Sequence, residues 1–153
     1  MQASEFVKQT LKTERDEIEI IASAIDISAL LASVADPEAG ASSLFLGSVR
    51  NHNQGKGVLY LEYECYPEMA LLEIQSILQT ARERWSLKRI GVIHRVGRIE
   101  IGEAAVAIAV SSVHRQESIE AMHFIIDTLK ASVPIWKKEY WQDGSMWLEN
   151  CCG

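Results

Sequence analysis

The chain has 153 residues, of which 48% are hydrophobic and 24% charged, the size and composition of one globular domain. Its net charge of −6 argues against a nucleic-acid-binding protein that works through its overall field. No apolar run approaches the about 20 residues that a membrane-spanning helix needs, and residues 1–17 lack the apolar core of a signal peptide.

The charge and the cysteines are unevenly placed. Residues 1–85 carry 7 Lys/Arg and 13 Asp/Glu, whereas residues 86–153 carry 8 of each, so the second half repels an anionic ligand less. The three cysteines (Cys65, Cys151 and Cys152) form neither a disulfide framework nor a CxxC pair. This cysteine pattern indicates a reducing compartment, and we expect the protein in the cytosol.

The first half of the chain predicts short strands and a helix. We expect residues 1–12 to be loose, a strand at 17–22 and a short helix at 27–34 that ends before Asp36-Pro37. Residues 41–50 read as a strand, residues 51–57 as a polar loop with glycines, and residues 58–65 as an alternating strand with Leu59, Leu61, Tyr63 and Cys65 on one face. Two strands around a Gly-rich loop predict a hairpin.

The second half predicts two main helices between strands. Pro67 opens a helix whose apolar residues recur at helical spacing up to Trp85, and a second helix covers residues 116–131. Strands are expected at 90–96, 105–110, 135–141 and 146–148, with a turn between Gly97 and Gly102 and another at Gly144. We therefore predict one α+β domain over residues 1–153, with a mixed, largely antiparallel sheet.

Basic residues stand at three places where an element begins or ends. Arg50 follows a strand, His114-Arg115 begins a helix, and Lys130 ends that helix. A guanidinium fork suits phosphate or carboxylate, and a helix N-terminus attracts anions. Two of the three also have a structural interpretation: Arg50 as a solvated strand end, and Ser111 or Ser112 as the cap of the helix while His114 only packs.

The strand at 135–141 places Lys137 and Glu139 on one face, with Trp136 and Lys138 on the other. A lysine beside a glutamate can support proton transfer or stabilise developing negative charge; a surface strand of mixed charge is the alternative. His94, in a strand, is expected to be a packed, hydrogen-bonded core histidine. The four histidines show no HxH or HExxH spacing, so we expect no metal site.

Several short motifs occur in order along the chain, from about Gly40 to Trp147. They are Phe45-Leu46-Gly47-Ser48-Val49-Arg50-Asn51-His52-Asn53, Leu61-Glu62-Tyr63-Glu64, His94-Arg95-Val96-Gly97, Ser111-Ser112-Val113-His114-Arg115, and Leu129-Lys130 followed by Pro134-Ile135-Trp136-Lys137-Lys138-Glu139. Together they closely resemble the catalytic (large) subunit family of molybdopterin synthase.

The resemblance implies an α/β hammerhead-type fold and a sulfurtransferase of molybdenum cofactor biosynthesis. Such an enzyme converts cyclic pyranopterin monophosphate to molybdopterin, with sulfur from the C-terminal thiocarboxylate of a small ubiquitin-like carrier subunit. It implies no cofactor of its own, and a homodimer that binds two carriers as a heterotetramer. The implied catalytic residues are Lys130, Lys137 and Glu139. The implied substrate-binding residues are these three with Phe45, Ser48, Val49, Arg50, His114, Arg115 and Lys138.

The length of the second helix adds a geometric expectation. Fifteen steps from Arg115 to Lys130 at about 1.5 Å each span about 22 Å, so the two cationic groups of one chain lie far apart. We expect a site shared across a homodimer interface. A non-catalytic phosphate- or pterin-binding module would use the same cations without turnover, and a structural adaptor would bind no small molecule.

Overall fold

The computed structural model describes residue 6 and residues 8–150. Its central element is a five-stranded sheet with the order β1-β2-β6-β8-β3. These strands are β1 (Gln9–Lys12), β2 (Asp16–Ile21), β6 (Ile90–Arg95), β8 (Ala104–Ser112) and β3 (Ala41–Ser48). The β2–β6 pair is parallel, whereas the β1–β2, β6–β8 and β8–β3 pairs are antiparallel.

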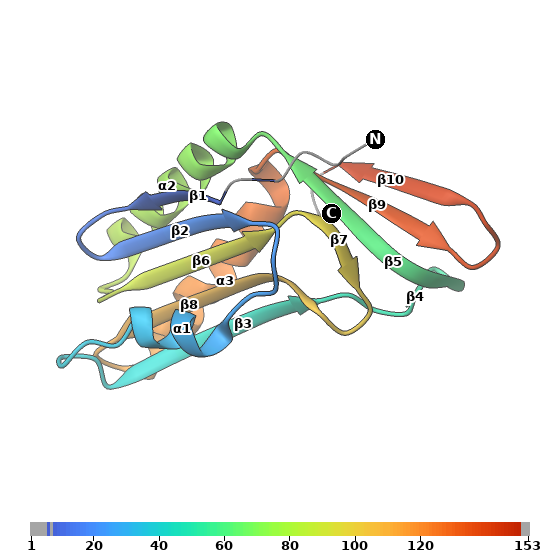
Figure 1. Ribbon diagram of the computed structural model, residues 1–153. Helices are drawn as coiled ribbons and strands as arrows, with labels where there is room; N and C mark the ends of the chain where they lie inside the picture. Colours follow the sequence, from blue (N-terminus) through green and yellow to red (C-terminus); the bar gives the residue numbers. More distant parts are fainter. Residues whose placement is uncertain (1–5, 7, 151–153) are drawn as a thin grey trace.

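Helices cover both faces of this sheet (Figure 1). The two long helices, α2 (Pro67–Arg84) and α3 (Arg115–Ser132), pack on one face, and the short α1 (Ile27–Ser33) packs on the other. Gly91 in β6 allows the close approach of α1, because an added Cβ there would lie 2.6 Å from a methyl group of Leu30. The prediction of an α+β fold with a mixed, largely antiparallel sheet and two main helices is confirmed.

A second, smaller sheet continues from one end of the first (Figure 1). It has the order β10-β9-β5-β4, with β7 also paired to β5. Its strands are β4 (His52–Asn53), β5 (Lys56–Cys65), β7 (Gly97–Glu100), β9 (Ile135–Trp141) and β10 (Met146–Asn150). One buried hydrophobic cluster includes Val58, Leu61 and Tyr63 of this sheet together with Val92 and Ile108 of the first, so the sheets share a core.

The predicted hairpin between residues 41–50 and 58–65 is wrong. β3 pairs with β8 and β5 pairs with β7 and β9, so the two strands belong to different sheets. The Gly-rich loop instead closes a small hairpin between β4 and the start of β5. Gln54 and Gly55 at its tip have φ of 50° and 78°, and two such residues in succession favour a tight turn over a long loop.

Three smaller expectations also need correction. Residues 9–12 are not loose, because they form β1 along β2 and Leu11 packs against the core. Residues 97–102 contain β7 as well as a turn. Leu59 is 49% exposed and not on the face of Leu61, because a register shift between Val58 and Tyr60 interrupts the alternation. Residues 1–5 and 7, and Cys151 and Cys152, lie outside the described residues.

Candidate active site

A cavity of about 190 Å³ opens at the junction of the two sheets, beside the C-terminal end of α3. β3 and the segment after it form one wall, β5 and β9 form another, and the last turn of α3 forms a third. Its lining residues are Gly47, Ser48, Arg50, His52, Asn53, Val58, Leu61, Tyr63, His94, Ala105, Val106, Ile126, Leu129, Lys130, Lys137 and Glu139. Three of its side chains are Lys or Arg, as an anion-binding pocket requires.

Glu139 is the buried acidic group of this cavity, with 3% of its surface exposed. Asn53 Nδ2 donates to both of its carboxylate oxygens, at 3.1 and 2.9 Å, and Trp141 Nε1 donates to Oε1 at 2.9 Å. Lys137 Nζ lies 3.7 Å from Oε2. A buried carboxylate is costly unless it is paired and hydrogen-bonded, and these three neighbours meet that requirement.

Strand alternation in β9 explains why Lys137 and Glu139 face the cavity together. It also places Lys138 on the opposite face, where it pairs with Glu62 of β5 in the backbone register and lies outside the cavity lining. The structure thus brings Lys137 and Glu139 together with Lys130, which enters from the last turn of α3. It does not bring Lys138 to the same pocket.

Residues 45–50 contribute unequally to the cavity lining. Ser48 and Arg50 line the cavity, with Arg50 directly after the strand. Val49 between them is buried and belongs to the hydrophobic core, where its backbone N–H donates to Glu103. Phe45 is half-buried against the same core and lies outside the cavity lining. Ser48 and Arg50 are therefore placed to contact a ligand, and Val49 and Phe45 support them from behind.

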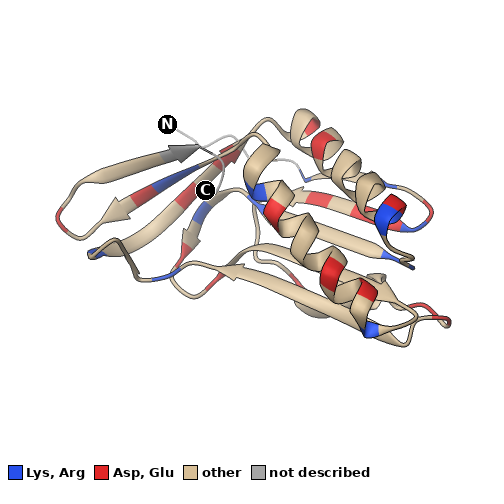
Figure 2. Cartoon of the chain, turned by 180° about the vertical axis from the view of Figure 1, so that it is seen from behind, with Lys and Arg blue, Asp and Glu red and all other residues tan. Residues whose placement is uncertain are grey.

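His114 and Arg115 lie at the other end of α3. Figure 2 shows basic residues toward both ends of this helix and acidic residues between them. Ser112 holds the helix start: its Oγ donates to the His114 carbonyl and accepts from the Ser118 backbone N–H at 3.1 Å. The His114 side chain makes no capping hydrogen bond. Ser112 therefore caps the helix, which leaves the His114 and Arg115 side chains able to contact a ligand. Neither residue lines the cavity of its own chain.

His94 is the core histidine that the sequence predicted, and it also forms part of the cavity floor. It is 1% exposed, its Nδ1 lies 2.9 Å from the Arg95 carbonyl oxygen, and its ring meets Tyr63 edge-on at 5.1 Å. Burial lowers the His94 pKa to about 4, against an opposing contribution from the Arg95 carbonyl. The ring is therefore neutral near pH 7, with Nδ1–H as the donor.

Sequence reasoning did not single out Asn53, Tyr63 or Trp141 as site residues. Asn53 lay within a predicted loop, and no spacing rule connects it with Glu139, whereas strand alternation places Trp141, two residues after Glu139, on the same face. Cys65 is not part of the lining, and burial raises the pKa of its thiol to about 11. It stays protonated near neutral pH and is a poor nucleophile.

Comparisons with known proteins show the family of this chain. The family model described as "MoaE protein" matches residues 20–132. The molybdopterin synthase catalytic subunit of Dictyostelium discoideum is 45% identical over 144 residues, which is 92% of this chain and 91% of that protein. The chain belongs to the MoaE family. The family match includes Arg50, His114, Arg115 and Lys130 and ends before Lys137 and Glu139.

Two solved structures extend the comparison to MoaE folds. The molybdopterin synthase of Staphylococcus aureus superposes with a TM-score of 0.81 at 35% identity, over 85% of this chain and 94% of that one. A Helicobacter pylori structure, described as a complex of subunits 1 and 2 of molybdopterin-converting factor, has a TM-score of 0.69 at 21% identity and shows the same fold. It covers 82% of this chain and 86% of its own.

Within residues 6 and 8–150, no three His, Cys, Asp or Glu side chains are grouped so that they could hold a metal ion. No helix in that part of the chain is long and apolar enough to cross a membrane.

Proposed function

We propose that this MoaE family member is the catalytic subunit of a molybdopterin synthase. It transfers sulfur from the thiocarboxylated C-terminus of a small ubiquitin-like carrier to cyclic pyranopterin monophosphate, and so builds the dithiolene of molybdopterin. The observation that carries this proposal is the convergence of Lys130, Lys137, Glu139 and Arg50 on one cavity, although they come from three separate segments.

The cations suit an anionic substrate. Arg50 can clamp a phosphate oxygen pair from the exposed side of the cavity. Ser48 supplies a hydroxyl beside it. A narrow cavity also suits an extended glycine tail, because glycine has no side chain to accommodate. His114 and Arg115 add phosphate and pterin contacts from a second copy of the chain.

Lys130 and Lys137 stabilise the negative charge that develops on the thiocarboxylate carbonyl oxygen during transfer. Such charge is stabilised most strongly by donors that are already in place. Glu139 orients Lys137, and Asn53 and Trp141 in turn fix Glu139 through the hydrogen bonds described above. The sulfur arrives on the carrier, so the reaction needs no cysteine of this chain and no resident cofactor.

The assembly that this function requires contains two copies of this chain and two carriers, and we place it in the cytosol. The Helicobacter pylori structure, a two-subunit complex with the same fold, supports the carrier as a partner.

The decisive experiment compares two adjacent lysines of β9. Lys137→Ala should reduce single-turnover formation of molybdopterin from thiocarboxylated carrier and cyclic pyranopterin monophosphate by about 100-fold, the typical loss when one charge-stabilising donor is removed. Lys138→Ala is the matched control and should stay within about twofold of wild type, because its side chain lies on the opposite face.

The result also separates an enzyme from a binding module. If wild type binds the pterin phosphate tightly but forms no product with the thiocarboxylated carrier, the protein is a binding module. Equal losses in the two lysine variants would contradict the assigned pocket.

A further inference from the structure

His52 is a cavity residue to which the proposed function assigns no role. It lies in β4 and lines the cavity together with the lysines and the carboxylate of the site. Its side chain is exposed, so the ring contacts solvent as well as the cavity. Among side-chain types, histidine is the one that ordinarily gains and loses a proton between about pH 5 and 8. The His52 ring is therefore placed to exchange protons with water or a ligand in the cavity.

The hairpin that carries His52 is held against the rest of the site. On the residue after it, Asn53 Nδ2 donates to both carboxylate oxygens of Glu139. Beyond the turn, Lys56 Nζ pairs with Asp143 Oδ2 at 2.9 Å. Backbone pairing of β4 with the start of β5 adds a third restraint. The backbone at His52 thus keeps a defined position relative to Glu139, as a group that acts on a bound reactant requires.

The neighbouring Asn51 orients the His52 ring. Asn51 Oδ1 lies 2.9 Å from His52 Nδ1. Because an amide oxygen accepts hydrogen bonds and cannot donate them, this contact places the proton of the neutral ring on Nδ1. Nε2 is then the nitrogen without a proton, which is the atom that accepts one when a histidine acts as a base. A histidine base oriented by a third polar group is a recurring arrangement in enzymes that break acyl bonds.

The other titratable groups of the cavity are less suited to take a proton from water. Lysine and arginine side chains ordinarily stay protonated near pH 7. The Glu139 carboxylate already accepts hydrogen bonds from Asn53 and Trp141. Burial lowers the His94 pKa to about 4, so its ring takes up no proton near neutral pH. The titratable and charged groups that line the cavity with His52 are Arg50, Tyr63, His94, Lys130, Lys137 and Glu139.

Sulfur transfer from a thiocarboxylate requires proton transfer at one particular step. When the carrier sulfur bonds to a substrate carbon, that sulfur still bears the acyl group of the carrier as a thioester. Water must then bond to the acyl carbon and the C–S bond must break, so that the carrier leaves as a carboxylate and the sulfur stays on the substrate. The attacking water loses a proton, and the departing sulfur gains one. A single group that first accepts and then donates a proton serves both needs.

We propose that His52 is the proton-transfer residue for this hydrolysis and that Asn51 is its positioning residue. His52 Nε2 accepts a proton from the attacking water as the water oxygen bonds to the acyl carbon. The electron pair of the C–S bond leaves with the sulfur, and the imidazolium returns its proton to that sulfur. The second proton of the water leaves when the new carboxyl group of the carrier ionises. The step consumes water and needs no oxidant or reductant, and it rests on the proposed function.

The first test measures hydrolysis directly. Single-turnover reactions are quenched with acid, and the carrier–pterin thioester is followed by intact mass. In wild type the decay rate of this adduct should rise through about pH 6–7, where histidine ordinarily loses its proton. His52→Gln should lose this dependence, slow the decay by about 100-fold and accumulate the adduct. The matched control is His123→Gln, because His123 is 78% exposed on α3 and pairs with Asp127, outside the cavity lining. It should behave as wild type.

The second test separates proton transfer from a structural role. Free imidazole should accelerate adduct decay in His52→Ala, because the position is exposed. Asn51→Asp keeps an acceptor for Nδ1–H and should move the pH dependence to higher pH, since a carboxylate beside the ring favours its charged form. Asn51→Ala should slow decay about tenfold, with carrier binding unchanged. A purely structural role of His52 predicts no imidazole rescue and no shift of the pH dependence, and that result would overturn the proposal.

The failure of this role and the failure of the proposed function give different results. Wild-type protein that forms no molybdopterin from thiocarboxylated carrier and cyclic pyranopterin monophosphate would overturn the proposed function, and the role of His52 with it. Wild-type turnover together with adduct decay at the wild-type rate in folded His52→Gln protein would overturn the role of His52 alone. A cooperative melting transition establishes that each variant is folded.

Discussion

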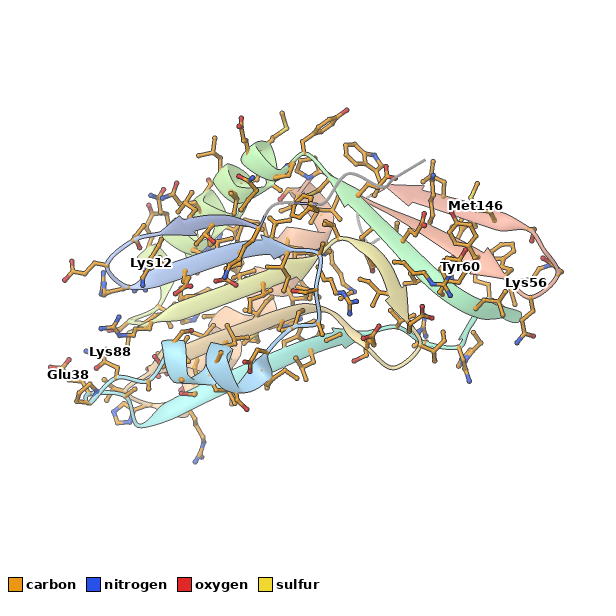
Figure 3. The ribbon with its side chains drawn as sticks, viewed as in Figure 1. Lys12, Glu38, Lys56, Tyr60, Lys88 and Met146 are labelled. Carbon is orange, nitrogen blue, oxygen red and sulfur yellow. The ribbon has the colours of Figure 1, made fainter. Side chains whose placement is uncertain are left out.

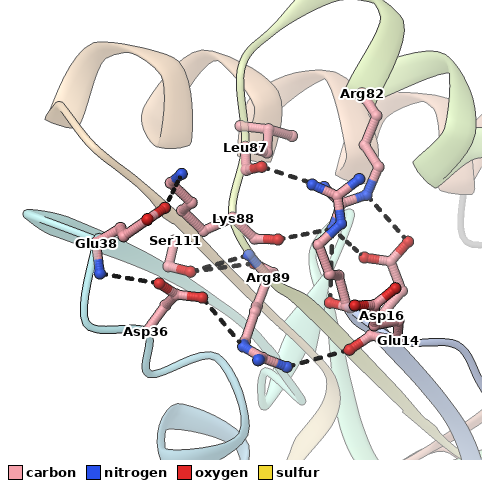
Figure 4. A network of polar contacts seen from close by, with 10 residues as sticks. Glu14, Asp16, Asp36, Glu38, Arg82, Leu87, Lys88, Arg89 and Ser111 are labelled. Carbon is pink, nitrogen blue, oxygen red and sulfur yellow. Dashed lines mark hydrogen bonds and ion pairs between the residues drawn. The ribbon is translucent and has the colours of Figure 1, made fainter.

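The two ends of α3 carry similar charges but are built differently. At the C-terminal end, Lys130 faces a cavity with a buried carboxylate. At the N-terminal end, ion pairs and hydrogen bonds join β2, the end of α2, the start of β6 and the loop after α1 (Figure 4). Figure 3 shows Lys88 and Glu38 at this end, far from Lys56, Tyr60 and Met146.

The centre of the N-terminal network is Arg82. It pairs with Asp16 through two hydrogen bonds and donates to the Leu87 carbonyl at 3.2 Å and the Lys88 carbonyl at 3.0 Å. Arg89 pairs with Asp36 at 3.3 Å, and its backbone N–H donates to Ser111 Oγ at 3.1 Å. The cations of this network are ion-paired within the chain, whereas those of the cavity end surround an open space. One end of α3 therefore supports the fold, and the other supports chemistry.

The largest expected effect is a loss of unfolding free energy when the network at the N-terminal end of α3 is disrupted. Arg82→Ala leaves Asp16 without its partner, and removal of one member of a buried pair typically costs about 3–5 kcal/mol of unfolding free energy. Both side chains are under 20% exposed, at 16% and 12%, so screening by solvent is limited. Urea unfolding measures the loss, and single-turnover rates at 15 °C should stay near wild type. Arg84→Ala, two residues further along α2, should cost less. A turnover rate far below wild type in folded Arg82→Ala protein would contradict the comparison.

The next effect concerns the cavity end. Lys130→Ala should reduce kcat by about 10²–10³-fold, the range for loss of one charge-stabilising donor, while the unfolding free energy changes little because Lys130 is exposed. Lys12→Ala, an exposed lysine of β1, is the control and should leave kcat unchanged. Substantial residual turnover in Lys130→Ala would remove Lys130 from the mechanism.

A third effect is the contribution of the buried His94 to the pH dependence of stability. His94 has a pKa of about 4 when folded and 6.5 as its ordinary value. Between these pH values the unfolded chain binds more protons than the folded chain. The contribution of His94 to the unfolding free energy is therefore fully present above pH 6.5 and is lost as pH falls toward 4. The loss amounts to about 3 kcal/mol. Unfolding free energies at pH 7 and pH 4.5 should differ less in His94→Gln than in wild type; equal differences would show that other groups cause the acid sensitivity.

The smallest effect tests how Glu139 is positioned. Asn53→Ala removes both Asn53 hydrogen bonds to the carboxylate, each of which contributes about 1 kcal/mol or more when the acceptor is charged. We expect kcat to fall about tenfold with little change in KM for the carrier, because the reacting groups shift while the binding surface remains. Asn53→Gln keeps the amide and should recover part of the rate. A change confined to KM would place Asn53 in binding instead.

The charged residues of the cavity were predictable from motifs, but the Asn53 side chain that holds Glu139 in place was not. Arg50, Lys130, Lys137 and Glu139 stand at ends of elements or on one face of a strand, where spacing reveals them. The resemblance placed Lys138 and Phe45 at the pocket, but both lie outside its lining. For Lys138, the alternation of β9 already predicts the opposite face. Asn53 could not be foreseen, since it is 86 residues from Glu139 in sequence and only the fold brings the two together. Trp141, two residues after Glu139, shares its face of β9 by strand alternation.

The N-terminal network shows the same limit. Asp16, Arg82 and Arg89 look like ordinary surface charges in the sequence, and only their packing turns them into a partly buried set. The predicted β3–β5 hairpin is wrong for a related reason. A strand can pair with any other strand of the chain, and β3 pairs with β8 and β5 with β9 instead of with each other.

The sequence by itself determined the element types, the family and the cations at both ends of α3, because periodicity, end positions and short motifs are local properties. It also determined that these cations lie about 22 Å apart, since helix rise is constant. Tertiary structure alone decided that two sheets meet around Glu139 and that β3 is, among the described strands, an uncharged edge of its sheet. Those properties depend on which segments pack together, and packing is a property of the whole chain.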